Sequence, residues 1–504
     1  MRGIETPVKK NRQRIFSEIT KAAIKASDPD FDLSKEVIEI PYRIVRDEKD
    51  VYKHSIFRAR AIISSRIRLA LGLSLTPTDK PVPVTEGIGK TNNDEKYYEP
   101  PLMQVIPAAC EKCPDNEYKV SDMCRGCLAH PCVSVCPKNA IKIINGKSHI
   151  DKELCIKCGK CKSVCPYDAI SKLERPCSKA CGIKAITTDD YGNALIDSNK
   201  CVSCGMCEVS CPFGAISDKS QIFQLTRALC KKEHLIAILA PAYVGQFGDN
   251  IKTRHLVAAL EQIGFDKVYE VALGADIGAI TEAHHYVKEV KTGKLPFLLT
   301  SCCPAWSMLA KTQFPDLADS VSSALTPMVA TARSIKKTDT DARVVFIGPC
   351  ASKKLEASRK TVRSDVDFVI TFEELRGMFD GFEIDLSSYE AESSLHDATG
   401  AGRGYAIAGG VAEAIKNCIN EYYPGESVDI RHAEGLEECK KMLMLAKTGK
   451  LKGCMIEGMG CPGGCIAGAG TLLPIEKAKK NVATHVSHSS KPLPPKELEE
   501  IELN

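Results

Sequence analysis

Two stretches of this 504-residue chain repeat the cysteine spacing Cys-x2-Cys-x2-Cys-x3-Cys-Pro. In such a run three closely spaced thiolates hold one 4Fe-4S cube, and the fourth, set apart by the proline turn, reaches a neighbouring cube. The two runs are Cys155, Cys158, Cys161 and Cys165, and Cys201, Cys204, Cys207 and Cys211. They predict clusters that carry single electrons. Another part of the chain must therefore contain the site where these electrons react.

Two incomplete half-runs lie in the same segment, which holds 16 of the 25 cysteines. One is Cys124-x2-Cys127-x4-Cys132-x3-Cys136-Pro137, with two added residues, and the other survives as Cys177-x3-Cys181-Gly182. All four half-runs are followed at the same offset by an Ala-Ile pair, which begins at positions 140, 169, 185 and 215. We interpret the segment as two tandem two-cluster ferredoxin-like units, with about four 4Fe-4S cubes.

Within such a unit each half lends its last cysteine to the cube of the other half. The expected ligand sets are Cys124, Cys127, Cys132 with Cys165; Cys155, Cys158, Cys161 with Cys136; Cys201, Cys204, Cys207 with Cys181; and Cys177, Cys211 with the upstream pair Cys110, Cys113. Two alternatives stay open. The two perfect runs could form a single unit, or a zinc ion could occupy Cys110, Cys113, Cys124 and Cys127.

Three more cysteine motifs lie in the second half of the chain. They are Thr300-Ser301-Cys302-Cys303-Pro304-Ala305-Trp306, Gly348-Pro349-Cys350-Ala351-Ser352-Lys353-Lys354-Leu355-Glu356, and Glu457-Gly458-Met459-Gly460-Cys461-Pro462-Gly463-Gly464-Cys465. Each follows an expected strand, and the carboxyl ends of parallel strands meet at one rim of a sheet. Any one of these cysteines alone would be interpreted as a buried core thiol. Their expected convergence favours a site instead, with four thiolates for one further cube and a fifth thiol beside it.

The elements that position these motifs can be outlined from the alternation of apolar runs and helical segments. Strands are expected at residues 235–239, 267–273, 296–300, 343–347, 368–370 and 453–456, and a helix at 277–290. This alternation predicts an α/β catalytic domain of parallel sheets flanked by helices. The expected domains are a helical N-terminal extension at 1–75, a Pro-rich linker at 76–101, an α+β ferredoxin-like cluster domain at 102–220, the catalytic domain at 230–480 and a tail at 481–504.

Composition and charge narrow the class of protein. The net charge of +4 is small for this length and the basic residues are scattered, which argues against nucleic acid as a partner. The sequence near Met1 lacks a secretory apolar region, and no run of about 18 apolar residues suggests a membrane span. So many cysteines without an export signal indicate metal rather than disulfides. We therefore expect a cytoplasmic protein without a membrane partner.

The N-terminal extension carries an arginine-flanked apolar stripe. Ile56, Ile63 and Ile67 recur at heptad-like intervals beside four arginines, Arg58, Arg60, Arg66 and Arg68. Such a stripe could dock an acidic partner, but a helix packed on the main body is the simpler interpretation.

The three motifs of the second half resemble the signatures of the iron-iron hydrogenase family, over about residues 230–475, and the cluster segment is similar to the relay domains of such enzymes. The resemblance implies an H-cluster, which is a 4Fe-4S cube joined through one cysteine to a two-iron unit with carbon monoxide, cyanide and a dithiolate amine. It implies Cys303, Cys350, Cys461 and Cys465 as cube ligands, with Cys465 as the bridge. It also implies that Lys353 donates to a cyanide, that Met459 flanks the two-iron unit, and that Pro241 and Ala242 line its pocket.

The resemblance assigns the fifth thiol, Cys302, to proton delivery, which suits a group that can both donate and accept a proton. Glu282 and Ser322 match the next members of the family's proton path, while His285 stands where the family has an outer glutamate. Histidine can relay protons near neutral pH. Without the resemblance, Glu282, His284 and His285 would be interpreted as the polar face of a surface helix.

The implied activity is the reversible interconversion of protons, electrons and dihydrogen, with maturation proteins that supply the H-cluster and a ferredoxin as the expected redox partner. Gly348, Ala305 and Ala469 depart from the better-known members and indicate a less-studied branch. The alternatives are a dihydrogen sensor, a cluster carrier or assembly factor of the same fold, and a ferredoxin-linked enzyme of different chemistry. Cluster carriers typically lack the first cysteine of the Cys-Cys pair, which is present here as Cys302.

Overall fold

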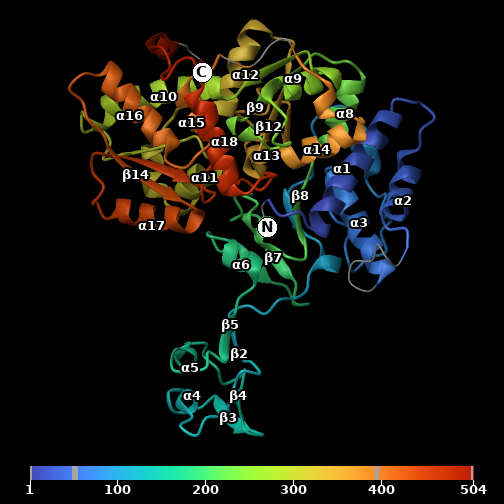
Figure 1. Cartoon of the computed structure of the whole chain (residues 1–504), viewed down its shortest axis with the longest axis vertical. Helices are drawn as coiled ribbons and strands as arrows, with labels where there is room; N and C mark the ends of the chain where they lie inside the picture. The colour runs from blue at the N-terminus through green and yellow to red at the C-terminus, as the bar shows by residue number, and fades with distance from the viewer. Residues whose placement is uncertain (1–2, 48–54, 392–394, 396, 501–502, 504) are drawn as a thin grey trace.

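The N-terminal extension is helical, as the sequence predicts. The computed structural model describes residues 3–47, 55–391, 395, 397–500 and 503, so residues 48–54 of the extension lie outside the described part. Its helices are α1 (Pro7–Lys25), α2 (Leu33–Ile44) and α3 (Ile56–Ala70). Each begins after a residue whose side chain accepts backbone N–H groups, Thr6, Asp32 and Ser55. Figure 1 shows the three helices together at one edge of the molecule.

The arginine stripe on α3 contacts the rest of the chain. Arg66 and Arg68 are buried, Arg66 donates to the carbonyl of Gly214, and Arg68 donates to three carbonyls within residues 74–86. Arg58 donates to the carbonyl of Ala108 at 2.7 Å. These internal contacts support the packed-helix interpretation rather than a docking stripe.

The segment at 76–101, which the sequence indicates as a linker, is docked on the catalytic domain. It contains the short helix η2 (Ile88–Lys90). The Lys96 ammonium donates to the carbonyls of Ala357 at 3.1 Å, Arg363 at 2.6 Å and Val366 in the catalytic domain. A lysine head group needs acceptors when it leaves water, and these three carbonyls hold the segment in place.

The two ferredoxin-like units are nested, not tandem. Strand β1 (Met103–Val105) pairs antiparallel with β8 (Ile216–Asp218), and the pair of β2 (Glu117–Val120) with β5 (Ile170–Leu173) lies between them in sequence. The unit built on β2 and β5 is therefore inserted into the unit built on β1 and β8. The insertion separates Cys110 and Cys113 from Cys177, which explains why this half-run is incomplete in the sequence.

The other elements of the cluster domain complete the two units. The inserted unit contains α4 (Pro131–Ser134), β3 (Ile141–Ile144), β4 (Lys147–Ile150) and α5 (Lys160–Ser163), and the outer unit contains η3 (Pro107–Ala109), α6 (Pro176–Ala180), β6 (Ile186–Thr188), β7 (Ala194–Ile196) and α7 (Met206–Ser210). Figure 1 shows the inserted unit projecting away from the body, whereas the outer unit lies against it.

The catalytic domain contains two parallel sheets. One has the order β10-β9-β12-β13 and the other β11-β15-β14. Their strands are β9 (Leu235–Leu239), β10 (Lys267–Glu270), β12 (Arg343–Gly348), β13 (Phe368–Thr371), β11 (Leu298–Leu299), β14 (Asp429–Glu434) and β15 (Cys454–Met459). Parallel strands need crossover connections, and the helices of the domain supply them.

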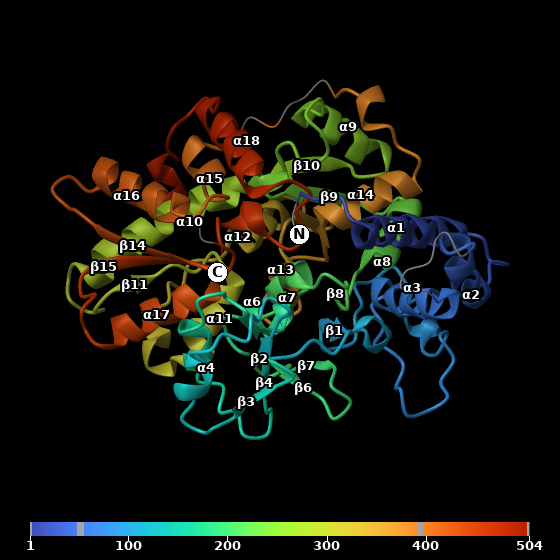
Figure 2. The same ribbon diagram turned by 60° about the horizontal axis from the view of Figure 1, so that its bottom comes forward.

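These helices cover the sheets (Figure 2). They are α8 (Ile222–Cys230), α9 (Thr253–Gln262), α10 (Ala272–His285), α11 (Pro304–Gln313), α12 (Pro327–Thr338), α13 (Ala351–Ala357), α14 (Phe372–Gly381), α15 (Gly400–Gly404), α16 (Gly410–Tyr422), α17 (Leu436–Lys447) and α18 (Ile475–Ser487), with short helices η4 (Pro241–Tyr243), η5 (Tyr286–Val290), η6 (Pro315–Ser320), η7 (Leu386–Ser388), η8 (Cys465–Ala467) and η9 (Lys496–Glu500). None of the helices described here is long and apolar enough for a membrane crossing.

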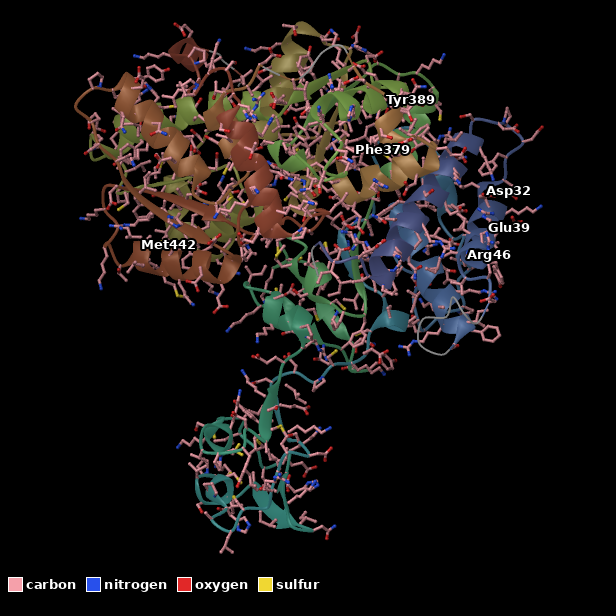
Figure 3. All side chains as sticks on the ribbon, viewed as in Figure 1. Asp32, Glu39, Arg46, Phe379, Tyr389 and Met442 are labelled. Atoms are coloured by element: carbon pink, nitrogen blue, oxygen red, sulfur yellow. The ribbon has the colours of Figure 1, made fainter. Side chains whose placement is uncertain are left out.

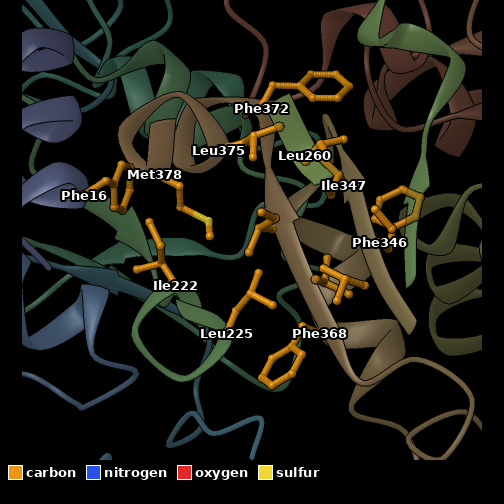
Figure 4. Close-up of a cluster of buried hydrophobic side chains, with 14 of the residues drawn as sticks. Phe16, Ile222, Leu225, Leu260, Phe346, Ile347, Phe368, Phe372, Leu375 and Met378 are labelled. Carbon is orange, nitrogen blue, oxygen red and sulfur yellow. The ribbon is translucent and has the colours of Figure 1, made fainter. Parts of the chain in front are cut away.

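The largest core joins the N-terminal extension to the four-stranded sheet. Figure 4 shows Phe16 of α1 facing Met378 of α14, with Ile222 and Leu225 of α8 below and Phe368 of β13 beside them. All five side chains are buried. The extension therefore folds as part of the catalytic body.

Three expectations about the elements of the catalytic domain were wrong in detail. The strand expected to reach residue 273 ends at Glu270, since α10 begins at Ala272. The helix expected at 277–290 is α10 followed by a π-helical turn, η5. Strand β14 was not predicted, because its sequence Asp-Ile-Arg-His-Ala-Glu is polar and largely exposed at a sheet edge.

The boundary expected between the catalytic domain and a tail lies inside α18. His485 of that helix contacts the Glu270 carboxylate at 3.3 Å, and Ser489 beyond it contacts Arg403 at 3.0 Å. Arg403 also forms a buried ion pair with Glu270 at 2.8 Å. The first part of the expected tail is thus packed into the body.

Candidate active site and iron-sulfur relay

The three cysteine motifs of the catalytic domain converge on one cavity of about 80 Å³. Its lining includes all five expected sulfurs, from Cys302, Cys303, Cys350, Cys461 and Cys465. Apolar side chains form most of the remaining wall, and they are Ala240, Pro241, Val271, Ala275, Pro327, Met328, Phe346 and Met459. A dry, sulfur-rich cavity of this kind fits a metal cluster whose ligands are thiolates.

The motifs meet between the two sheets and not at the rim of one. Cys302 and Cys303 follow β11, and Cys461 follows β15, both in the three-stranded sheet, whereas Cys350 follows β12 in the four-stranded sheet. The carboxyl ends of both sheets point toward the cavity. The expected convergence is therefore present, but it depends on how the two sheets face one another.

Glycines allow the loops to approach closely. At Gly464 the backbone φ is +88°, and an added Cβ would lie 2.5 Å from the amide nitrogen of Ala408. At Gly458 an added Cβ would lie 2.0 Å from the ring of Trp306, whose Nε1 donates to the carbonyl of Thr300 at 3.1 Å. Only glycine fits at such contacts, so these positions hold the Trp306 loop and the Gly464 loop around the same cavity.

Two departures from the better-known family pattern have a packing reason. A Cβ on Gly348 would lie 2.4 Å from the ring of Phe346. Phe346 lines the cavity and occupies the space that a larger side chain at 348 would need. A Cβ on Gly205 would lie 2.4 Å from the methyl of Ala469, so Ala469 fills the contact between the catalytic and cluster domains.

Burial makes the cavity thiols reluctant to ionise. It raises the pKa of Cys350 to about 11 and that of Cys465 to about 12, with nearby thiols adding to the effect and Lys353 opposing it. A metal must displace these protons to bind. Burial, followed by the Glu282 and Cys303 charges, also raises the pKa of Cys302 well above its ordinary value. A thiol that is no cluster ligand therefore keeps its proton and can donate it.

Lys353 is the cation of the cavity. Its ammonium pairs with the Glu356 carboxylate at 2.7 Å, and both side chains are buried. An ammonium has three N–H groups, so this ion pair leaves donors for an anionic ligand in the cavity. Together with the four thiols of Cys303, Cys350, Cys461 and Cys465, the residues present fit an H-cluster.

Glu282 is buried behind Cys302, with 2% of its surface exposed. Its Oε1 accepts from the amide of Ser301 at 2.9 Å and from the Ser301 hydroxyl at 3.1 Å, and the Ser322 hydroxyl also donates to the carboxylate. Burial raises the pKa of Glu282 to about 7, although these hydrogen bonds oppose the rise. Such a carboxyl can take up and release protons near neutral pH.

The outer end of the path is not continuous in the described residues. His285 is half-buried on α10, and burial lowers its pKa, followed by the nearby charge of His284. No hydrogen bond joins His285 to Glu282 or Ser322 within the described part of the chain. His284, its neighbour, contacts the Tyr423 hydroxyl at 3.2 Å.

Ala242, which was expected to line the cavity, is not among its lining residues, and several residues that do line it were not expected. Ala242 lies in the hydrophobic core and its carbonyl accepts from Gln246, whereas Ala240 lines the cavity next to Pro241. No sequence pattern pointed to Tyr405, which reaches the cavity from the loop after α15. Its hydroxyl is buried without a hydrogen-bond partner among the described residues. Tyr405 lies far from every motif, so only the fold could reveal it.

The outer cluster unit gathers the two cysteine sets expected for it. Cys110, Cys113, Cys177 and Cys211 line one pocket, and Arg175 donates to the carbonyl of Cys113 at 2.9 Å. Burial raises the pKa of Cys177 to about 11, and Cys211 and Cys110 add to the rise.

The second set of the outer unit contains Cys181, Cys201, Cys204 and Cys207. Burial raises the pKa of Cys204 to about 12, and the neighbouring Cys201 and Cys181 raise it further. Cys181 therefore lies with the last perfect run. This arrangement argues against the alternative in which the two perfect runs form a single unit.

The inserted unit gathers the remaining cysteines. Cys136 and Cys165 pack against the buried Cys132 and Cys161 in one core. Burial raises the pKa of Cys161, and the nearby Cys155 and Cys158 add to it. The exchange of last cysteines within this unit stays a prediction, as do the assignments of Cys124 and Cys127.

Nesting also separates the four cysteines of the zinc alternative. Cys110 and Cys113 belong to the outer unit, whereas Cys124 accepts from the amide of Ser148 in the inserted unit at 3.5 Å. Among the described residues, no three His, Cys, Asp or Glu side chains converge closely enough for a single ion. A cube holds its sulfurs farther apart than one zinc ion does, because four irons lie between them.

The outer unit adjoins the active-site cavity. The charge of Cys350 contributes to the raised pKa of Cys204, so the two thiols lie near each other. The Ser352 hydroxyl also donates to the carbonyl of Val202. The set of Cys181, Cys201, Cys204 and Cys207 is therefore next to the cysteines of the cavity. A chain of cubes bound at these sets would end at the active site.

The fold and the site define an iron-sulfur protein in which cluster-binding units precede an α/β domain with a thiol-lined cavity. Residues 233–469 match the family described as "Iron only hydrogenase large subunit, C-terminal domain". Residues 124–175 match an LdpA Fe-S cluster-binding domain and residues 194–217 a 4Fe-4S binding domain. The catalytic domain, over these matched residues 233–469, therefore belongs to the iron-iron hydrogenase-like family.

Similar proteins include hydrogenases and cluster assembly factors. Iron hydrogenase 1 of Clostridium pasteurianum is 29% identical over 388 residues, which cover 66% of this chain and 67% of that protein. A probable cytosolic Fe-S cluster assembly factor of Drosophila grimshawi is 27% identical, over 44% of this chain and 57% of that protein. A solved structure of the FeFe-hydrogenase HydA1 from Chlamydomonas reinhardtii is 21% identical, with a TM-score of 0.43, and covers 55% of this chain and 92% of that chain.

Proposed function

We propose that this protein reversibly interconverts protons and electrons with dihydrogen at an H-cluster in the cavity. The observation that supports this most directly is the fifth thiol. Cys302 lies beside four cysteines that suffice for a cube, and the buried carboxyl of Glu282 lies behind it. A protein that only holds a cube needs no proton donor there.

An H-cluster held by Cys303, Cys350, Cys461 and Cys465 would supply the making and breaking of the H–H bond. The chain's own residues would do the rest. Lys353 would donate to an anionic ligand of the cluster, and Pro241 and Met459 would keep water away from it. Restricted water access strengthens such electrostatic contacts.

Proton movement is assigned to Cys302, Glu282 and Ser322. Cys302 would hold a proton on Sγ at the cavity and exchange it with the Glu282 carboxyl, whose pKa near 7 suits both directions. Ser301 and Ser322 hold the carboxylate in place through hydrogen bonds. His285 remains the proposed outer member of the path.

Electrons are proposed to travel through about four accessory 4Fe-4S cubes. They would enter at the inserted unit, which projects from the body, and pass through the outer unit to the cavity (Figure 1). A soluble ferredoxin in the cytoplasm is the proposed redox partner, and H-cluster maturation proteins would load the two-iron unit.

Infrared spectroscopy tests this proposal. Protein matured anaerobically should show bands of metal-bound carbon monoxide and cyanide, where proteins themselves do not absorb, and should evolve or consume dihydrogen. Protein with a full complement of cube iron but without these bands would instead support a cluster carrier or assembly factor, the class suggested by the Drosophila relative. Bands with only slow turnover would support a dihydrogen sensor.

A further inference from the structure

The N-terminal extension lies outside the family matches, which begin at residue 124. Even so, α1 packs closely against α14 of the catalytic domain. An added Cβ on Gly377 would lie 2.3 Å from the Cβ of Phe16, and one on Gly381 would lie 2.5 Å from the Cβ of Thr20. Two glycines one helical turn apart let the helices touch, so α1 is seated directly on the catalytic domain.

This seating brings Arg12 of α1 into a buried ionic cluster. Its guanidinium pairs with the Glu208 carboxylate of α7 and with the Glu373 carboxylate of α14, the latter at 3.0 Å. The side chains are 14%, 4% and 6% exposed, respectively. One arginine thus joins the extension, the cluster domain and the catalytic domain.

The position of α7 brings the contact between Arg12 and Glu208 close to the cysteines of the outer unit. Glu208 directly follows Cys207, which belongs to the set next to the cavity, and α7 leads to Cys211 of the other set of the outer unit. Arg12, Glu208 and Cys211 line the same small pocket. Arg12 therefore lies beside α7, the helix that connects the two cysteine sets of the outer unit.

A second arginine of the extension approaches the same region. Arg66 of α3 is 6% exposed and donates to the carbonyl of Gly214, three residues after Cys211. The opposite side of the extension does not face the cluster domain. Figure 3 shows Asp32, Glu39 and Arg46 at the outer edge of the molecule, away from the cluster domain.

We propose that Arg12 sets the reduction potential of the two cubes of the outer unit. A guanidinium keeps its charge in proteins, and salt screens a buried charge weakly. Reduction of a cube adds a negative charge, which a nearby positive charge stabilises. Arg12 therefore raises the potentials of these two cubes relative to those of the inserted unit, which projects away from the extension.

This proposal rests on the accessory cubes of the proposed function but not on hydrogen chemistry. The test therefore uses the full chain with its cubes reconstituted anaerobically from iron and sulfide, and the potentials are measured by redox titration with electron paramagnetic resonance. If the cubes do not assemble, the relay itself fails. If they assemble and the potentials do not respond, only the role of Arg12 fails.

The decisive comparison is E208Q/E373Q against the triple variant R12Q/E208Q/E373Q. Both carboxylates that pair with Arg12 are then amides that cannot take up a proton, so the difference between these two variants isolates the charge of Arg12. At a fixed applied potential, the triple variant should show at least a tenfold lower ratio of reduced to oxidised cube for the outer unit, which is about 59 mV for a one-electron couple. The inserted unit should titrate as in the parent.

Lys10→Gln is the matched control, since Lys10 lies on the same helix and pairs with exposed Glu5 at 3.4 Å. Its potentials should equal those of the parent. Equal potentials in E208Q/E373Q and R12Q/E208Q/E373Q, or an equal shift in all four cubes, would overturn the proposal. If the triple variant does not bind iron, E208Q against R12Q/E208Q decides: the outer-unit potentials should be lower without Arg12, and unchanged values refute the role of Arg12.

Discussion

Replacing Glu282 by glutamine should slow hydrogen turnover and at the same time stabilise the protein at high pH. The amide can still accept from Ser301 but cannot carry a proton between Cys302 and the exterior. Removing a general acid-base group costs about 100-fold or more in rate. We therefore expect turnover with a reduced viologen dye to fall at least about 100-fold, while the infrared bands of the cluster keep their positions.

The stability gain follows from the pKa of this buried carboxyl. Burial raises the pKa from 4.5 to about 7, and a tenfold change in proton affinity is worth about 1.4 kcal/mol. The folded state prefers the protonated acid, so the cost of ionising Glu282 is absent below pH about 4.5, grows as the pH rises, and is complete above pH about 7. That cost reaches about 3 kcal/mol, and E282Q removes it.

The difference in unfolding free energy between E282Q and the parent should be followed as a function of pH. Any hydrogen bonding that the amide loses changes this difference by the same amount at every pH, so only the ionisation of Glu282 makes it vary. From about pH 5.5 to about pH 9 the stability advantage of E282Q over the parent should grow by about 2 kcal/mol. Anaerobic thermal unfolding followed by circular dichroism at one scan rate measures it. Near-parental turnover, or a difference in melting temperature that does not change with pH, would refute this account of Glu282.

Three further predictions concern the thiols and a buried lysine. Cys302→Ala should lower hydrogen turnover at least about 100-fold with the iron content unchanged, and near-normal turnover would remove Cys302 from proton delivery. Lys354→Met should destabilise the protein by about 3–5 kcal/mol in a denaturant titration. The Lys354 ammonium lies 2.7 Å from the Asp218 carboxylate and 2.8 Å from the Glu374 carboxylate, and the substitution leaves both carboxylates buried without their cation. Lys360→Met, at an exposed lysine, is the control and should have little effect in the same titration. Cys181→Ser should disturb the paramagnetic signal of the cube next to Cys350, whereas Cys165→Ser should leave that signal intact; the opposite pattern would contradict the ligand sets.

The local patterns predicted much of the fold because their signals are short-range. The apolar run at 235–239 became β9 with the expected bounds, since a strand buried on both faces is apolar along its whole length. The motif at Cys302 also lies where expected, after a strand, and the structure adds a helix that begins at Pro304. Strand β14 escaped prediction because an exposed edge strand can be polar.

Contacts between segments that are far apart in the sequence could not be predicted from local patterns. The pairing of β1 with β8 makes the cluster units nested, and their repeated spacing is the same in a nested and in a tandem arrangement. Tyr405 likewise lines the cavity from a loop without any motif.

The sequence by itself determined the candidate chemistry of this protein: cysteines at cluster spacings, a fifth thiol beside them, and strands that present them. These follow from residue types and short separations, which are fixed along the chain. Tertiary structure decided which thiols meet, since two separate sheets contribute to one cavity, and it placed the helical extension against both the cluster domain and the catalytic domain. Burial, which raises the pKa of Glu282 and encloses Arg12, depends on packing between segments hundreds of residues apart.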